Sequence, residues 1–183
     1  MVRGVILATD GVCDSQVEYA FYRLQEEGAL VDVLTPGGEA VAGSRGGEWD
    51  DSVSLSTCAA VERYDLVIVP SGVRVDAFDG TALRSWLRAH DAARTVLAAI
   101  GDGVGVLARL GVLRGHRASG PPAASSEMPN DDVEWCDEVV TVDGHVVTAG
   151  RGAALPYLVA AALDSTVLRQ RADDELTERP AWR

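Results

Sequence analysis

Residues 95–113 read TVLAAIGDGVGVLARLGVL, and the fold prediction starts from this segment. An apolar run, Val96–Ile100, ends abruptly at Gly101-Asp102-Gly103, and apolar residues then recur at helical spacing. The pattern predicts a buried strand, a tight turn and the start of a helix. Such a turn exposes one residue at the carboxyl end of a parallel sheet, where α/β proteins bind ligands. Hydrolases usually have Ser or Cys there, whereas this turn offers only Gly, Asp and Gly.

Strands and helices alternate along the rest of the chain. The patterns predict, in chain order, a strand at 2–8, a helix from Asp14 or Ser15 to Gly28, a strand at 30–34, a short helix at 57–63, a strand at 66–69, a helix at 82–90 capped by Asp79 or Thr81, a hairpin around Asp143-Gly144 and a last helix at 153–168. Continuous apolar strands between helices imply a mostly parallel sheet covered on both faces. We therefore expect one α/β domain over residues 1–170 and a charged tail at 171–183.

Composition narrows the classes of partner. The 183-residue chain has a net charge of −12, and all 16 of its basic residues are arginines. This acidity argues against nucleic acid and against anionic membrane surfaces. No segment approaches the roughly 18 apolar residues of a membrane span, and the first residues read as a strand and not as a signal peptide. We expect a cytoplasmic protein.

Cysteines and histidines are few and scattered. They are Cys13, Cys58, Cys136, His90, His116 and His145. Without a C-x-x-C motif or a ligand spacing, they indicate neither a disulfide framework nor a zinc site. We expect no metal and no cofactor, a structural role for Cys58 and Cys136, and an exposed His145 on the hairpin.

Four blocks carry a family resemblance. They read ILATDGVCDSQVEYAFYRLQEEGALVDVLTP (6–36), DLVIVPSG (65–72), AAIGDGVGVLARLGVLRGHRASG (98–120) and DVEWCDEVVTVDGHVVTAGRGAALP (132–156). In this order they resemble the PfpI (ThiJ/PfpI, intracellular-protease-like) family of the class I glutamine-amidotransferase-like superfamily. The resemblance implies a flavodoxin-like, three-layer α/β sandwich with a mostly parallel central sheet. It also implies a homodimer or a higher homo-oligomer.

The resemblance further shows that three functional residues are replaced together. The family's elbow reads Ile-Cys-His-Gly, so its nucleophilic Cys falls on Gly101 and its His on Asp102. The family's Glu that hydrogen-bonds the thiol falls on Cys13. Activities that need the elbow thiolate (peptidase, glyoxalase, deglycase, amidase) are therefore not expected, because glycine has no side chain to attack with.

Other family positions are retained in part. The oxyanion-forming Pro-Gly-Gly segment falls on Pro70-Ser71-Gly72, and the Gly-Lys-His-Gly segment on residues 44–47. The amides of Gly72 and of Asp102 or Gly103 remain available to an oxyanion or carboxylate. Gly101 either enlarges the pocket floor or only tolerates a strained turn.

Asp102 and Cys13 are the candidate catalytic residues, and each has two interpretations. Asp102 is a general acid or base on a small molecule, or only the N-cap of the helix that follows it. Cys13 is a nucleophile that has moved to the first loop, oriented by Asp102, or a small buried residue that fills the space of the lost Glu.

Charged residues complete the candidate binding site. Arg45 and Arg151 are candidates for binding an anionic substrate, and Asp14 and Asp76 for a carboxylate pair; an exposed surface charge is the alternative for each. In the family, an acidic residue at the position of Asp76 reaches a neighbouring subunit's site. The tryptophans Trp49, Trp86 and Trp135 are expected to pack and not to stack on a ligand.

Two functions follow from these residues. The first is a divergent PfpI-like enzyme that acts on a small organic molecule by cofactor-independent acid/base or hydrolytic chemistry, of the hydratase, lyase or hydrolase type. The alternative is a non-catalytic ligand-binding or interaction protein on the same fold.

Overall fold

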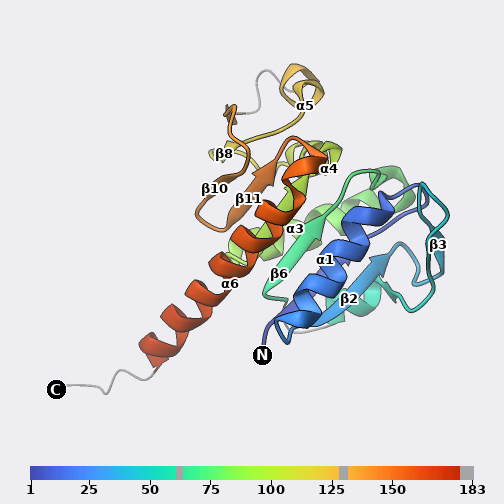
Figure 1. The fold of residues 1–183 in the computed structure, drawn as a ribbon, viewed down its shortest axis with the longest axis horizontal. Coiled ribbons are helices and arrows are strands. Elements are labelled where there is room, and N and C mark those ends of the chain that lie inside the picture. Colours follow the sequence, from blue (N-terminus) through green and yellow to red (C-terminus); the bar gives the residue numbers. More distant parts are fainter. Residues whose placement is uncertain (61–63, 128–131, 178–183) are drawn as a thin grey trace.

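A seven-stranded sheet forms the centre of the protein, in the order β10-β11-β7-β6-β1-β2-β5 (Figure 1). The computed structural model describes residues 1–60, 64–127 and 132–177. All pairs in this sheet are parallel except β10–β11, which forms the antiparallel hairpin. The predicted mostly parallel, flavodoxin-like α/β fold is therefore confirmed. Residues 61–63 of a predicted helix and 178–183 of the predicted tail lie outside the described residues.

The strands of the main sheet are short and mostly buried. They are β1 (Arg3–Leu7), β2 (Leu30–Thr35), β5 (Val53–Ser54), β6 (Leu66–Val69), β7 (Val96–Ile100), β10 (Thr141–Asp143) and β11 (Val146–Ala149). Every residue of β6, β7 and β11 is buried, as expected for parallel strands covered on both faces. Two smaller sheets pair β3 (Val41–Ala42) with β4 (Glu48–Trp49), and β8 (Arg117–Ala118) with β9 (Glu134–Trp135).

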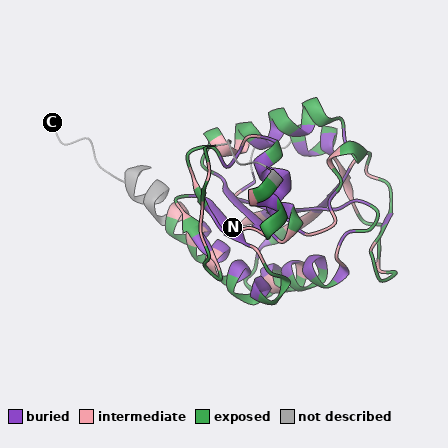
Figure 2. Cartoon of the chain, turned by 90° about the horizontal axis from the view of Figure 1, so that it is seen from above, coloured by how far each residue is buried: buried purple, intermediate pink, exposed green. Residues whose placement is uncertain are grey.

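Helices cover both faces of the sheet. They are α1 (Asp14–Glu26), α2 (Leu55–Ala60), α3 (Gly80–Ala92), α4 (Asp102–Arg109), α5 (Pro122–Glu127) and α6 (Leu155–Thr177), with short 3₁₀ turns at Val75–Ala77 and Gly152–Ala154. Helices α1 and α6 pack together on one face, and α2, α3 and α4 cover the other (Figure 1). Buried residues lie on the strands and on the sides of the helices that face them (Figure 2). Among the described residues, none of the helices combines the length and apolar character needed to cross a membrane.

The structure differs from the sequence prediction at several elements. Strands β5 and β9 and helix α5 are not in the prediction, because segments of two to six residues are too short to show a period. The last helix extends to Thr177 and not Leu168, because no Gly or Pro intervenes there although the apolar pattern fades. Asp79 caps α3, accepting hydrogen bonds from the amides of Thr81 and Ala82.

His145 is also not where the sequence placed it. It was expected to be exposed on the hairpin, but only 6% of it is accessible. Its Nε2 lies 2.7 Å from Asp91 Oδ1 at the end of α3. His145 follows the turn of the hairpin, and its backbone carbonyl accepts a hydrogen bond from Leu97 N in β7, 2.8 Å away, which holds this residue against β7.

Candidate functional site

The candidate site lies at the carboxyl edge of the sheet, where the loops after β1, β6 and β7 meet. These loops hold Cys13, Ser71-Gly72 and Gly101-Asp102, and backbone hydrogen bonds connect them. Cys13 N donates to Ser71 O at 2.9 Å, and Gly101 N donates to Ala149 O, at the end of β11, at 2.9 Å. The sheet topology therefore brings the predicted site residues to one edge, as it does in other α/β proteins.

The turn after β7 keeps an elbow geometry without a side chain. Gly101 has φ 58° and ψ −132°, a conformation that residues with a Cβ rarely adopt. A Cβ built on Gly101 would clash with Ser71 Oγ, which donates to Ile100 O at 3.2 Å. The hydroxyl of Ser71 therefore occupies the space that an elbow side chain would need.

Asp102 is not the N-cap of the helix, because the cap position is Gly101 and Asp102 is the first residue of α4. Its Oδ1 instead accepts a hydrogen bond from Gly72 N, 3.0 Å away. This is the amide that the sequence assigned to an oxyanion or substrate carboxylate. The side chain is otherwise exposed at the carboxyl edge.

Gln16 is a site residue that the sequence analysis missed. Its Oε1 accepts from Ser71 N at 2.7 Å, so side-chain oxygens take both amides of the Ser71-Gly72 loop. Gln16 is only 6% accessible. A polar residue in register with the buried Ala20 and Leu24, at intervals of four, was the signal for it.

Cys13 is half-buried at the N-cap position of α1. Its Sγ lies 3.5 Å from Ser15 Oγ, within hydrogen-bond distance, and no hydrogen bond to the Asp102 carboxylate is described. Both residues reach the same loop, since Cys13 N binds Ser71 O and Asp102 binds Gly72 N. The geometry thus brings the two candidates to neighbouring positions without a described hydrogen bond between them.

Asp14 organises the loop between β3 and β4. Its carboxylate accepts from Ser44 Oγ at 3.1 Å and from the amides of Arg45 and Gly47, both at 2.7 Å. Burial raises the pKa of Asp14, but these hydrogen bonds outweigh it, so the pKa lies below its ordinary value of 3.8. Asp14 is therefore a buried loop anchor, and Arg45 contributes its backbone while its side chain is exposed.

Asp76 and Arg151 have no described hydrogen bond to the elbow loops. Asp76 pairs with Arg74, with 2.8 Å between its Oδ2 and the guanidinium, and this hydrogen bond lowers the pKa of Asp76. No carboxylate pair between Asp14 and Asp76 is described. Arg151 is exposed and lines a cavity.

Gly103 lies so close to Val69 O and Pro70 that a Cβ there would clash, which fixes α4 against the end of β6.

The largest of the cavities described has a volume of about 570 Å³ and lies at the same edge, beside β11. Besides Arg151, its lining includes Ser119, Cys136, Glu138 and Tyr157. The volume is within the range of small-molecule sites. No residue of the Gly101–Gly103 elbow belongs to its lining.

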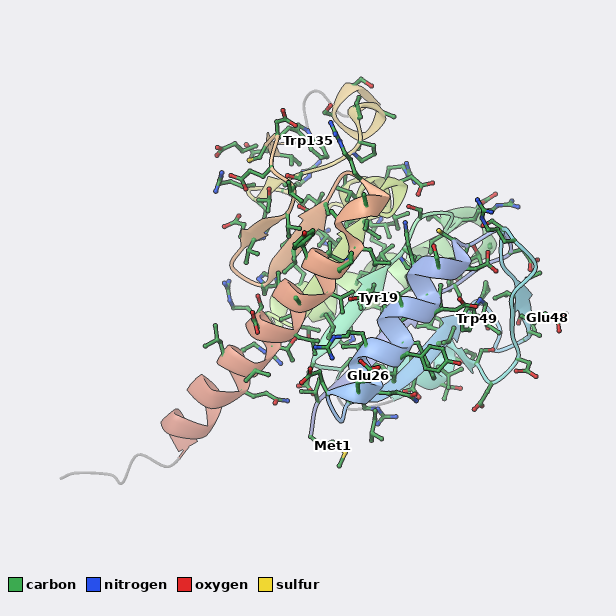
Figure 3. All side chains as sticks on the ribbon, viewed as in Figure 1. Met1, Tyr19, Glu26, Glu48, Trp49 and Trp135 are labelled. Atoms are coloured by element: carbon green, nitrogen blue, oxygen red, sulfur yellow. The ribbon has the colours of Figure 1, made fainter. Side chains whose placement is uncertain are left out.

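Tryptophans are dispersed and pack against the body. Trp86 is buried, and Trp49 and Trp135 are half-buried against the core. Figure 3 shows Trp49 at the β3–β4 side and Trp135 near α5, well separated from each other. They therefore do not form one stacking surface.

Comparisons with known proteins find relatives over most of the chain. The model of the DJ-1/PfpI family matches residues 2–165. A deglycase of Pyrococcus abyssi is 28% identical over 150 residues, covering 81% of this chain and 89% of that protein. Protein dj-1beta of Drosophila melanogaster is 29% identical over 123 residues, covering 66% of this chain and 65% of that protein.

Solved structures show the same fold. The crystal structure of Drosophila melanogaster DJ-1beta superposes with a TM-score of 0.79 at 22% identity, covering 98% of this chain and 99% of that one. A two-domain protein of Anabaena variabilis, with DJ-1/ThiJ/PfpI-like and ferritin-like domains, gives a TM-score of 0.82 at 25% identity. The match covers 90% of this chain and 48% of the Anabaena protein, so the chain spans about half of that relative.

Proposed function

Because the chain belongs to the DJ-1/PfpI family, we propose that it is a divergent member acting on a small organic molecule by acid/base chemistry. The reaction is of the hydratase, lyase or hydrolase type and needs no cofactor. Asp102 is its general base, at the position next to the family's elbow. The proposed location is the cytoplasm.

One observation carries this proposal: the carboxylate of Asp102 is held at the elbow yet accessible. Oδ1 accepts from Gly72 N, which fixes the side chain, and the group stands exposed at the start of α4. A carboxylate positioned by one oxygen keeps the other free to take a proton from a substrate or from an attacking water. Neither step requires a side chain on Gly101.

The names of relatives suggest one substrate class to test first. Curated relatives from three archaea are called deglycases. In this chain the elbow position is Gly101, so glycated amines are expected to react only if Asp102, and not a thiolate, activates water. A panel of candidate substrates for the activity assay therefore includes glycated amines, aldehydes and activated alkenes.

The test is the Asp102→Asn variant. Its amide oxygen still accepts from Gly72 N, so the turn is preserved while the base is lost. Turnover of a substrate found in the panel is expected to fall by about 10²- to 10⁴-fold. Asp164→Asn, an exposed carboxylate on α6, is the matched control and is expected to keep full activity. Full activity in Asp102→Asn would exclude the proposed base, and Cys13→Ser then shows whether the thiol acts instead.

A second candidate function is ligand binding without turnover, and two observations favour it. The elbow space and the two loop amides are already taken by Ser71, Gln16 and Asp102. The 570 Å³ cavity holds Arg151 but no elbow residue. An anionic small molecule would bind there with Arg151 as its cation. A ligand that binds to wild type and Asp102→Asn equally, is weakened by Arg151→Gln and is recovered unchanged would establish this function.

A further inference from the structure

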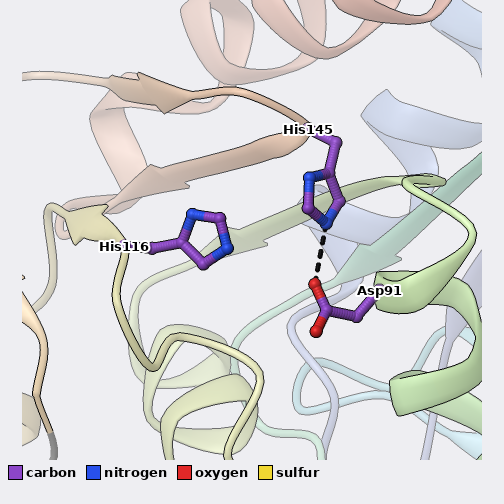
Figure 4. Close-up of side chains that lie close together, drawn as sticks. All are labelled: Asp91, His116 and His145. Carbon is purple, nitrogen blue, oxygen red and sulfur yellow. Dashed lines mark hydrogen bonds and ion pairs between the residues drawn. The ribbon is translucent and has the colours of Figure 1, made fainter.

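The fold gathers titratable side chains at the amino edge of the sheet, opposite the candidate site. Asp91 lies in the last turn of α3, before β7, and His145 directly precedes β11. Because β7 and β11 run parallel, their first residues meet at the edge away from the elbow. His116, in the loop before β8, completes the cluster (Figure 4).

The three side chains are within reach of one ion. One ligand atom from each lies within 4.8 Å of the other two. His145 Nε2 and Asp91 Oδ1 are 2.7 Å apart, and the rings of His116 and His145 meet edge to face with centroids 5.4 Å apart. Two imidazoles and a carboxylate form a ligand set that zinc uses with a water in the fourth position.

An outer carboxylate orients one of these ligands. His116 Nδ1 donates to Asp143 Oδ2 at 2.9 Å, and the same oxygen accepts from Arg117 N at 3.0 Å. This bond leaves the other ring nitrogen, Nε2, as the one with a lone pair, and Figure 4 shows it on the side of Asp91 and His145. A carboxylate behind a histidine is the arrangement that fixes a metal-binding tautomer.

The second imidazole has an unused nitrogen. His145 is 6% accessible, and its Nδ1 is buried with no hydrogen-bond partner among the described residues. Nε2 faces Asp91 and is the ligand atom, and the ring proton lies on Nδ1 when Nε2 binds a metal. The ring is therefore held by one bond, to Asp91, and is able to exchange that bond for a metal ligand.

From this geometry we infer that Asp91, His116 and His145 form a divalent transition-metal site of the zinc type. Atoms bound to a tetrahedral zinc are about 3.4 Å apart, so the ion separates Asp91 from His145 slightly and draws the half-buried His116 inward by about 1 Å. Imidazole nitrogen favours zinc over magnesium or calcium, and the absence of thiols from the set argues against copper(I).

Charge and access are compatible with a cation. Two carboxylates lie at the site, Asp91 in the cluster and Asp143 behind His116. Two guanidiniums, those of Arg94 and Arg169, line a hollow beside His145, and Arg169 pairs with Asp65 at 3.4 Å. A surface hollow of about 370 Å³, lined by His116, Gly115 and Glu134 among others, provides a path from solvent. The ion would connect α3, the loop before β8 and the β10–β11 hairpin.

Zinc titration of the full chain, followed by calorimetry and by thermal unfolding, tests the inference. Wild type is expected to bind one equivalent and to unfold at a higher temperature with zinc. Asp91→Asn, which still accepts from His145, and His116→Gln are expected to lose binding. Asp143→Asn is expected to weaken it by about 10- to 100-fold, as outer carboxylates do. His90→Gln and Asp164→Asn, the matched controls, are expected to bind as wild type does.

Cobalt(II) spectra of wild type provide a measurement that does not depend on the variants folding. Ligand-field bands without thiolate charge transfer would support the site, whereas thiolate bands would assign the ion to a cysteine and overturn it. Absence of binding by wild type, or unchanged binding in folded Asp91→Asn and His116→Gln, would also overturn it. None of these outcomes depends on Asp102 or the elbow, so the metal site and the proposed function are tested independently.

Discussion

The backbone conformation of Gly101 is one in which any residue with a side chain is strained. This chain has glycine at the position where the family it resembles has a nucleophilic cysteine. The Gly101 φ of 58° is favourable for glycine alone, and Ser71 Oγ lies where a Cβ would be. Replacement of the elbow residue and placement of Ser71 are therefore linked. The orientation of the Asp102 side chain likewise depends on a contact with the Ser71-Gly72 loop. Its carboxylate accepts a hydrogen bond from the Gly72 amide and does not cap the helix that follows.

This link predicts that Gly101→Ala destabilises the protein more than a positive φ alone explains. The φ contribution is about 1–2 kcal/mol, and the clash with Ser71 Oγ adds to it. Urea unfolding is expected to show a larger loss than in Gly115→Ala, which has φ 75° and open space around a Cβ. In a Ser71→Ala background the loss in Gly101→Ala is expected to shrink. Additive effects of the two substitutions would contradict the steric link.

Helix α1 and the β3–β4 hairpin are held together by one carboxylate. Asp14 at the start of α1 binds the amides of Arg45 and Gly47, and a Cβ on Gly43 or Gly47 would clash with it. The sequence indicated only a helix start and a glycine-rich loop. Hydrogen bonds between residues about 30 positions apart are a tertiary contact, which no local pattern encodes.

Stability is predicted to fall at low pH through Asp14. Its pKa is below 3.8 in the folded state, so the unfolded chain binds more protons in the acid range. The stabilisation is present above the unfolded pKa and is lost as the pH falls through the folded one. Denaturant unfolding from pH 7 to pH 2 is expected to show a shallower decline in Asp14→Asn, which starts less stable. Asp50→Asn, an exposed control, is expected to keep the wild-type slope; equal slopes for all three would contradict the role of Asp14.

At the scale of the whole molecule, one exposed surface is notable: large apolar side chains of α1 face the solvent. Tyr22 is 62% accessible and Tyr19 36%, one helical turn apart, and Figure 3 labels Tyr19 beside α1. The two tyrosines line a shallow surface hollow of about 350 Å³, which Ser15, Arg23 and Glu26 also border. A surface of this kind fits contact with a second copy of the chain, and the family resemblance implies a homodimer or a higher homo-oligomer.

A homodimer would have a solution mass of twice the 19.3 kDa chain, and sedimentation equilibrium measures this mass. Tyr22→Glu is expected to shift the protein to monomer, because it places a charge in an apolar contact. Leu168→Glu, an exposed apolar position on α6, is the control and is expected to remain dimeric. A wild-type monomer at micromolar concentration would refute the dimer.

Sequence alone predicted the strands of the main sheet except β5, their parallel direction, the β10–β11 hairpin and the position of the elbow. Buried strands and turns leave local apolar and glycine patterns, whereas the two residues of β5 are too few to show one. It also identified the family through blocks that span nearly the whole chain. It placed Cys13, Gly72 and Asp102 near one edge, because parallel strands bring their carboxyl ends together.

The contacts of those residues depend on the tertiary structure. It placed Asp102 on the Gly72 amide, Ser71 in the elbow space and Gln16 on Ser71 N. It also brought Asp91, His116 and His145 together, although they are scattered over 55 positions of the sequence. The physical reason is that side-chain partners are set by the packing of distant segments, whereas strands and turns are set by neighbours along the chain.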